Sequence, residues 1–183
     1  MSMTKADREF DIIVYGASGF TGRLVAEYMQ QQYGRSVNWA MAGRSAEKLA
    51  QVRDEMGIDA ATPLVTANAD SADDMVAMVA RTKVIITTVG PYQLYGDALL
   101  AACAAAGTDY VDLSGEPGWM HGTIAAHHDA AKASGARIVH SCGFDSIPFD
   151  LGVYFLQQAA KEKFGRPCRH VHVRVRTMHG EFS

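Results

Sequence analysis

The chain has 183 residues, of which 48% are hydrophobic and 20% charged, and its formal net charge is -3. This length fits one domain, or one domain and the start of another, and the composition is that of an ordinary globular protein. The Lys and Arg residues form no basic stripe, so neither nucleic acid nor an anionic membrane surface is expected as a partner.

The N-terminal residues 1–9 are polar and mixed in charge, without the apolar core of a signal peptide. No apolar run reaches the roughly 18 residues that a spanning helix needs. Cys103, Cys142 and Cys168 are odd in number and far apart, which excludes a disulfide framework. The histidines have no Cys or Glu at ligand spacing, so no metal site is expected. We therefore expect a cytoplasmic protein without a transmembrane segment, and peripheral association with a membrane is left open.

Short apolar segments alternate with longer segments of helical periodicity along most of the chain. Strands are predicted over residues 10–15, 38–42, 63–67, 84–89, 109–112 and 137–140. Helices are predicted over residues 21–33, 46–56, 72–80, 97–106, 121–134 and 148–163.

Capping residues mark several of the predicted helix ends. Ser45 is a typical N-cap, and Ser71 with Asp74 resembles a capping box. Gly57 and Gly107 follow the last periodic residue of their helices, where glycine ends a helix most readily.

The alternation of strands and helices predicts βαβ units and therefore a parallel sheet. Right-handed crossovers then give a doubly wound sheet (Rossmann fold) of three αβα layers with strand order 3-2-1-4-5-6. In this order, a ligand binds at the carboxyl ends of the first and fourth strands, where the winding reverses. We therefore expect the loop after residue 15 and the loop 89–92 to face each other across a cofactor.

The last stretch of the chain differs in character from the rest. Between His170 and Met178, valine alternates with His or Arg, which is the pattern of a half-exposed strand. We interpret it as the first strand of a truncated second domain. The predicted division is residues 1–165 for the dinucleotide-binding domain and residues 166–183 for the start of the next domain.

A glycine-rich turn, G-x-x-G-x-x-G, lies between the first predicted strand and the first helix. Gly16 permits a tight turn, Gly19 lets a pyrophosphate approach the backbone, and Gly22 lets helix and strand pack closely. A purely structural glycine turn is the alternative. The residues expected to contact a dinucleotide here are Gly16, Ala17, Ser18, Gly19, Phe20, Thr21 and Gly22.

The second predicted strand ends in Gly43, Arg44 and Ser45, at the place where this fold meets the adenosine ribose. An acidic residue there would bind the 2′-hydroxyl of NAD, whereas Arg44 can pair with the 2′-phosphate of NADP and Ser45 can donate to it. We therefore predict that the domain prefers NADP(H) to NAD(H). The alternative is that Arg44 is a solvated loop residue with no role in binding. Asp70, after the third strand, either contacts the adenine or caps the next helix.

The loop Val89-Gly90-Pro91-Tyr92 follows the fourth predicted strand. Gly90 allows backbone approach to a ligand and Pro91 stiffens the loop. Tyr92 could stack near a nicotinamide or donate a proton, with simple packing as the alternative. We place Val89, Gly90, Pro91 and Tyr92 among the cofactor-binding residues.

Further polar groups end the fifth and sixth strands. Cys142 could be a nucleophile if a base lowered its pKa, or a small buried thiol. Asp145 could orient a substrate or cap the following helix, and Ser146 could cap it equally well. Glu116 could point toward the cleft or favour the start of its own helix.

These residues bear on two further enzyme classes. No Tyr has a Lys four residues later, so short-chain dehydrogenase chemistry is unsupported. A semialdehyde or acyl-phosphate reductase needs a cysteine thiolate and a later histidine base. Cys142 offers only the first of these groups.

Four ordered blocks of sequence carry a family resemblance: VYGASGFTGRLVAEY (14–28), AGRSAEKL (42–49), TTVGPYQLYGDALLAACAAAGTDYVDLSGE (87–116) and SCGFDSIPFDLG (141–152). With them, residues 8–183 resemble the saccharopine dehydrogenase-like oxidoreductases, and within these the trans-acting enoyl reductase group.

The resemblance implies an NADP-dependent Rossmann domain followed by an α+β domain that supplies substrate contacts and a homodimer interface. It implies a complete protein more than twice this length, which reduces a carbon–carbon double bond of a lipid or polyketide intermediate, a small molecule or a carrier-linked acyl chain. Tyr92 and Asp145 are the candidates for proton donation or carbonyl polarisation. The alternatives are a saccharopine or amino-acid dehydrogenase and a non-catalytic NADP-binding scaffold. We expect no turnover from residues 1–183 alone.

Overall fold

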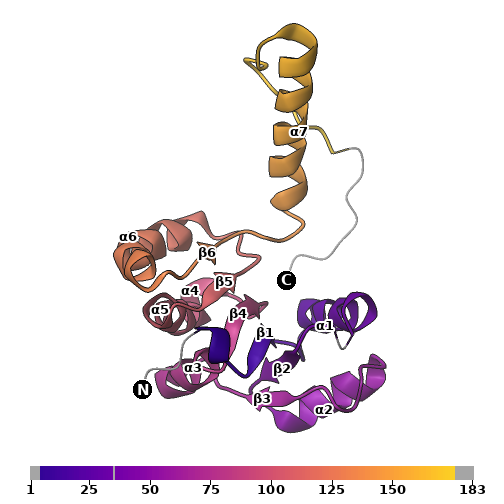
Figure 1. Cartoon of the computed structure of the whole chain (residues 1–183), viewed down its shortest axis with the longest axis vertical. Coiled ribbons are helices and arrows are strands. Elements are labelled where there is room, and N and C mark those ends of the chain that lie inside the picture. Colours follow the sequence, from indigo (N-terminus) through magenta and orange to yellow (C-terminus); the bar gives the residue numbers. More distant parts are fainter. Residues whose placement is uncertain (1–4, 35, 176–183) are drawn as a thin grey trace. The chain divides into compact units, whose positions relative to one another are not determined.

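The computed structural model of the protein describes residues 5–34 and 36–175. Its centre is a six-stranded sheet in the order β3-β2-β1-β4-β5-β6 with every neighbouring pair parallel (Figure 1). This confirms the predicted doubly wound order. The strands are β1 (Phe10–Tyr15), β2 (Trp39–Gly43), β3 (Leu64–Thr66), β4 (Thr82–Thr87), β5 (Asp109–Val111) and β6 (Ile138–Val139).

Helices between residues 20 and 55 pack on one face of this sheet and helices between residues 72 and 134 pack on the other, as the three-layer prediction requires. The helices are η1 (Lys5–Asp7), α1 (Phe20–Gln32), α2 (Ala46–Glu55), α3 (Ala72–Val79), α4 (Tyr92–Tyr95), α5 (Asp97–Ala106), α6 (Pro117–Ser134) and α7 (Ile147–Phe164). The short α4 was not predicted, since four residues carry no periodic pattern.

Two apolar cores, one on each face, hold the layers together. Side chains alternate across a strand, so Ile13 of β1 enters one core and Val14 enters the other. The Ile13 core includes residues of α3, α5 and α6, whereas the Val14 core includes residues of α1 and α2. The chain changes face between β3 and β4, and the reversal of winding there leaves the carboxyl ends of β1 and β4 adjacent.

The predicted caps are formed by side-chain hydrogen bonds. Ser45 Oγ accepts the Lys48 N–H at 3.3 Å, and Ser71 Oγ accepts the Asp74 N–H at 3.2 Å. Only half of the expected capping box exists, because the Asp74 carboxylate accepts from the Asn68 N–H at 2.9 Å instead. This contact fixes the turn between β3 and α3.

Two elements differ from their predicted ranges by more than one residue at an end. The fourth strand covers 82–87 rather than 84–89, because its register pairs Phe10 with Thr82 and Tyr15 with Thr87. The pairing therefore ends where β1 ends. Helix α6 starts at Pro117, four residues before the predicted start at residue 121, because proline is favoured in the first turn of a helix.

The chain divides into two compact units, one ending at Cys142 and the other beginning at Gly143. This division lies ahead of the boundary predicted at residue 165, and α7 belongs to the second unit. A substrate domain beginning at residue 166 stays a prediction. None of the helices in the described residues has both the length and the apolar character of a membrane-spanning segment.

The strand predicted between His170 and Met178 is not found in its described part, residues 170–175, and its last residues lie outside the described ranges. A strand needs a partner for its backbone groups, and residues 143–175 contain no other strand. The side chain of Gln157 on α7 instead accepts the Cys168 N–H at 2.7 Å and donates to its carbonyl at 3.1 Å.

Candidate functional site

The turn after β1 can be built only with glycine at two positions. Gly16 has φ +86°, and a Cβ there would lie 2.7 Å from Thr88 Oγ1 and 2.8 Å from Val89 Cγ2. A Cβ on Gly22 would collide with the Gly16 carbonyl. The tight turn and the close approach of helix to loop thus have the geometry expected of them.

The first turn of α1 presents free hydrogen-bond donors. Within the described residues, the backbone N–H groups of Phe20, Thr21 and Gly22 have no acceptor, whereas the Arg23 N–H donates to Gly19 O at 3.0 Å. Gly19 provides no side-chain cap. Unpaired N–H groups at the positive end of a helix dipole are an anion site.

The end of β2 lies directly beside this turn. Gly16 and Ala17 donate their N–H groups to Ala42 O at 2.9 and 3.1 Å. A Cβ on Gly43 would lie 3.5 Å from Ser18 Oγ. The structure therefore brings the tip of β2 and the glycine turn together.

Arg44 is exposed and, within the described residues, forms no hydrogen bond or ion pair. Its neighbour Ser45 uses its hydroxyl oxygen to cap α2. Asp70 is also exposed, and Ser71 rather than Asp70 caps α3. Burial raises the pKa of Tyr15 to about 12, and the negative charge of Asp70 is the second largest cause of this increase.

The loop after β4 lies against the glycine turn. The Thr88 N–H donates to Tyr15 O at 3.0 Å, and Thr88 Oγ1 donates to Gly16 O at 3.3 Å. The atoms nearest to a Cβ on Gly90 would belong to Tyr92, at 3.6 Å or more. The two loops that the strand order predicts to be opposite each other are thus in contact at the carboxyl edge of the sheet.

Tyr92 is buried, with 5% of its surface exposed. Its hydroxyl donates to Thr87 O at 3.2 Å and accepts from the Leu113 N–H at 3.3 Å. Burial raises the pKa of Tyr92 to about 12. The ring lies 5.4 Å from the Trp119 ring, between centroids, so the packing alternative describes the observed contacts of this side chain.

Glu116 contacts a different helix from the one that it precedes. Its Oε1 accepts the Tyr92 N–H at 2.8 Å and its Oε2 accepts the Gln93 N–H at 2.9 Å. Its side chain makes no capping bond to α6. Neither sequence alternative anticipated this arrangement, in which the loop after β5 holds the loop after β4.

Asp112, which directly follows β5, is the centre of a buried polar network. Its carboxylate accepts from the Tyr110 hydroxyl at 3.0 Å, from the Ser114 N–H at 3.0 Å and from the Ser141 N–H at 2.8 Å, and it lies 2.7 Å from His140 Nδ1. Burial alone would raise the pKa of Asp112, but the hydrogen bonds from His140 and the two N–H groups lower it.

Sequence comparison identifies the fold unit that carries this site. Residues 12–139, more than half of the chain, match the family described as the saccharopine dehydrogenase NADP-binding domain. The chain belongs to this family. The match confirms the predicted family and NADP(H) as the cofactor.

Relatives of this NADP-binding domain are found in mycobacteria. A Mycobacterium tuberculosis protein is 50% identical over 182 residues, 99% of this chain and 43% of that protein. Trans-acting enoyl reductases of Mycobacterium bovis and Mycobacterium leprae are 50% and 46% identical, over 87% and 91% of this chain and 38% and 40% of their own lengths. The chain therefore spans less than half the length of these curated relatives.

Solved structures share the fold of the NADP-binding domain. Saccharopine dehydrogenase (L-Glu forming) of Saccharomyces cerevisiae matches 83% of this chain and 32% of its own with a TM-score of 0.67 at 14% identity. Citrobacter triphenylmethane reductase complexed with NADP(H) matches 82% of this chain and 56% of its own with a TM-score of 0.54 at 17% identity. At these identities the matches show the fold alone.

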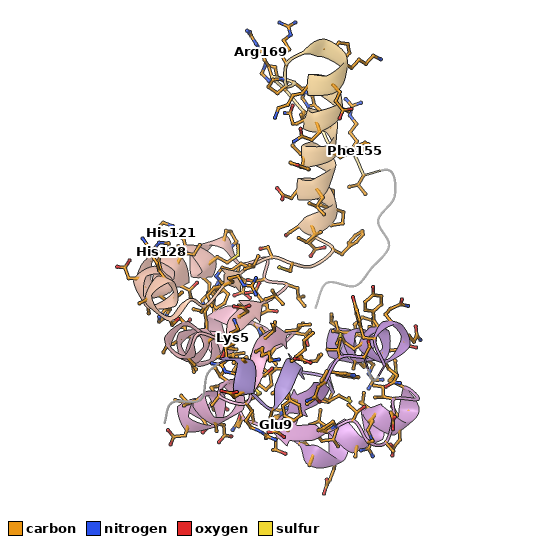
Figure 2. The ribbon with its side chains drawn as sticks, viewed as in Figure 1. Lys5, Glu9, His121, His128, Phe155 and Arg169 are labelled. Atoms are coloured by element: carbon orange, nitrogen blue, oxygen red, sulfur yellow. The ribbon has the colours of Figure 1, made fainter. Side chains whose placement is uncertain are left out.

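Two of the remaining candidates, Cys142 and Asp145, follow the matched residues 12–139 in the sequence. Burial, with the nearby Asp112 charge, raises the pKa of Cys142, which disfavours a thiolate nucleophile. Asp145 is exposed and lies in the second compact unit, whereas Tyr92 lies in the first; their joint role stays a prediction. His121 and His128 project from α6 (Figure 2) and are exposed.

Sequence patterns did not identify His140 as a site residue, and they named Glu116 as a candidate without predicting its contacts with Tyr92 and Gln93. Glu116 is 24 residues from its partner Tyr92 and His140 is 28 residues from its partner Asp112. A local sequence pattern cannot predict contacts between residues so far apart. The only available signal was that both end or follow a predicted strand, where ligand-binding residues of this fold gather.

Proposed function

We propose that the chain binds NADP(H) with its pyrophosphate at the first turn of α1. The observation that carries this proposal is the set of N–H groups of Phe20, Thr21 and Gly22 that lack an acceptor in the described part of the chain. They lie beside a turn whose glycines leave the backbone bare, so an anionic group can approach it closely.

Arg44 is proposed to bind the 2′-phosphate of the cofactor. It is exposed beside the glycine turn and has no partner in the described residues, so its guanidinium is available for a bidentate contact. Ser45 and Asp70 flank this end of the site. The segment 89–92 is proposed to face the nicotinamide.

We further propose that the complete protein is an oxidoreductase that reduces a carbon–carbon double bond of a lipid or polyketide intermediate, as an NADP-dependent enoyl reductase. The names of the mycobacterial relatives support this reaction. The bound cofactor would supply a hydride to the β-carbon of the enoyl group, and a protein group or water a proton to the α-carbon. Carrier linkage of the acyl chain and a homodimer are parts of the same proposal.

In this proposed reaction, the residues of this chain bind the cofactor and orient the reacting groups. Tyr92 already uses its hydroxyl in two internal hydrogen bonds, so we assign it to shaping the nicotinamide wall. Asp145 stays a candidate for proton transfer or for polarising the substrate carbonyl. The groups that select the acyl chain would come from the remainder of the complete protein.

A second candidate is an amino-acid dehydrogenase of the saccharopine type, favoured by the family description. A third is an NADP-binding scaffold without chemistry. Complete protein assayed with NADPH against an enoyl thioester and, separately, with NADP and saccharopine distinguishes the three. Oxidation of NADPH by the thioester alone supports the enoyl reductase; turnover of saccharopine, or of neither substrate, rejects it.

Calorimetric titration of this chain with NADPH and NADH tests the cofactor site. We expect at least a tenfold preference for NADPH, about 1.4 kcal/mol, that disappears in Arg44→Ala. Arg169→Ala, which removes another exposed arginine, should keep the preference. Equal binding of the two cofactors by the unaltered chain would reject the role of Arg44.

A further inference from the structure

Glu116 links the two loops that end β4 and β5. Each of its carboxylate oxygens accepts one backbone N–H from the start of α4, directly after the loop that ends β4: Oε1 accepts that of Tyr92 at 2.8 Å and Oε2 that of Gln93 at 2.9 Å. The residue itself lies at the start of α6, where it makes no side-chain cap. Within the described residues, both side-chain hydrogen bonds of Glu116 are therefore made to a segment more than twenty residues earlier.

Two further contacts hold the same segment from the same side. The Tyr92 hydroxyl accepts from the Leu113 N–H at 3.3 Å, and the Tyr92 ring packs on Trp119 with centroids 5.4 Å apart. The Trp119 indole is in turn fixed by Asp97, at 2.6 Å from Nε1 to Oδ1. We call Glu116, Tyr92 and Trp119 the loop clamp.

The segment held by the loop clamp is one wall of the candidate site. It begins at Val89 and Gly90, directly after Thr88, whose hydroxyl donates to Gly16 O at 3.3 Å. Glu116 fixes the other end of this segment by accepting the backbone N–H groups of Tyr92 and Gln93. The backbone between these two anchors is therefore positioned by the glycine turn on one side and by Glu116 on the other.

We propose that Glu116 is a positioning residue for the nicotinamide end of the cofactor, which it sets through the backbone of residues 90–93. This inference rests on the proposed function, because it needs the dinucleotide to run from Arg44 past the glycine turn to this loop. Glu116 acts through the backbone and does not touch the substrate.

A carboxylate is required for this role because both of its oxygens accept. In Glu116→Gln, one oxygen is replaced by an NH2 group that faces a backbone N–H, so one of the two loop contacts becomes a donor–donor repulsion. In Glu116→Asp, the carboxylate is kept but is one methylene shorter, so it can retain one contact. The two variants should therefore form a graded series.

The test compares two ligands that share the adenosine end of the cofactor. NADPH carries the nicotinamide, whereas 2′,5′-ADP carries only the adenosine and its phosphates. In Glu116→Gln, we expect the affinity for NADPH to fall about tenfold and the affinity for 2′,5′-ADP to stay within about twofold. Glu116→Asp should lie between Glu116→Gln and the unaltered chain. The matched control is Glu162→Gln, an exposed glutamate on α7, which should change neither affinity.

The outcomes separate this inference from the one on which it rests. An equal loss of both ligands in Glu116→Gln would show a general loss of structure and overturn the positioning role, as would unchanged NADPH binding. Absence of binding of either ligand by the unaltered chain would overturn the proposed function and this inference with it. Binding of both ligands by the unaltered chain, with loss of NADPH alone in the variant, supports both.

Discussion

His140 and Asp112 form a buried pair that joins the carboxyl ends of β5 and β6, with Nδ1 of His140 2.7 Å from Oδ2 of Asp112. Side-chain exposure is 10% for His140 and zero for Asp112. The Trp119 ring packs edge-on against His140 at 5.2 Å between centroids. The pair therefore joins the end of the first compact unit to Trp119 of the loop clamp.

Replacing Asp112 should destabilise the fold strongly. In Asp112→Asn, the amide oxygen can keep the N–H groups of Ser114 and Ser141, which both donate to Oδ1, but the NH2 group then replaces Oδ2, which accepts from the Tyr110 hydroxyl and lies beside His140 Nδ1. Hydrogen bonds to charged buried groups contribute about 1.5–3 kcal/mol, so we expect the free energy of unfolding to fall by about 2–3 kcal/mol. Urea denaturation measures it. Asp129→Asn, at an exposed position of α6, is the control and should be near neutral.

Acid should remove a stabilising contribution from Asp109, at the opposite edge of the sheet. Burial would raise the pKa of Asp109, but hydrogen bonds from Arg137 and Lys5 outweigh it and lower this pKa to about 2. The same carboxyl in the unfolded chain has a pKa of about 3.9. A pKa that is lower in the folded state stabilises the fold above the unfolded pKa, and this contribution is lost as the pH falls toward the folded value.

The measurement is the difference in stability between the unaltered chain and Asp109→Asn as a function of pH. We expect this difference to be largest above about pH 5 and to shrink between about pH 4 and pH 2. A difference that stays constant over this range would contradict the assignment of the low pKa to Asp109.

Local patterns predicted the parts of this structure that depend on neighbouring residues. The strand before Gly16, the Ser45 cap and the order of the sheet follow from periodicity, capping chemistry and the handedness of crossovers. The contacts of Glu116 could not be predicted in this way, because they depend on how closely two loops approach after the sheet has formed. The valine alternation after His170 predicted a strand that has no partner strand in the described residues, so the pattern alone was insufficient.

The close approach at Gly22 predicts a sharp difference between two glycine-to-alanine variants. Gly22→Ala places a methyl group against the Gly16 carbonyl, and this backbone cannot move without opening the turn. Overpacking of this kind costs about 1–3 kcal/mol, and we expect NADPH binding to be lost with it. Thermal unfolding and calorimetry measure the two effects.

Gly122→Ala is the matched control for Gly22→Ala. Gly122 lies within α6, and a Cβ there would have no atom within 4 Å. Because alanine is the better helix former by up to about 1 kcal/mol, this variant should be neutral or slightly more stable and bind NADPH normally. Equal behaviour of the two variants would show that the crowding at Gly22 has no bearing on cofactor binding.

The complete protein offers a test between Tyr92 and Asp145 as proton donors. Tyr92→Phe removes the hydroxyl that bonds Thr87 O and the Leu113 N–H, so the free energy of unfolding should fall by about 1 kcal/mol. Because this hydroxyl is internally bonded, we expect turnover to decrease less than about tenfold.

Asp145→Asn should lower kcat by about a hundredfold if its carboxyl transfers the proton. A large loss of kcat in Tyr92→Phe with an unchanged KM would reverse the assignment, and unchanged turnover in both variants would remove both residues from the reaction.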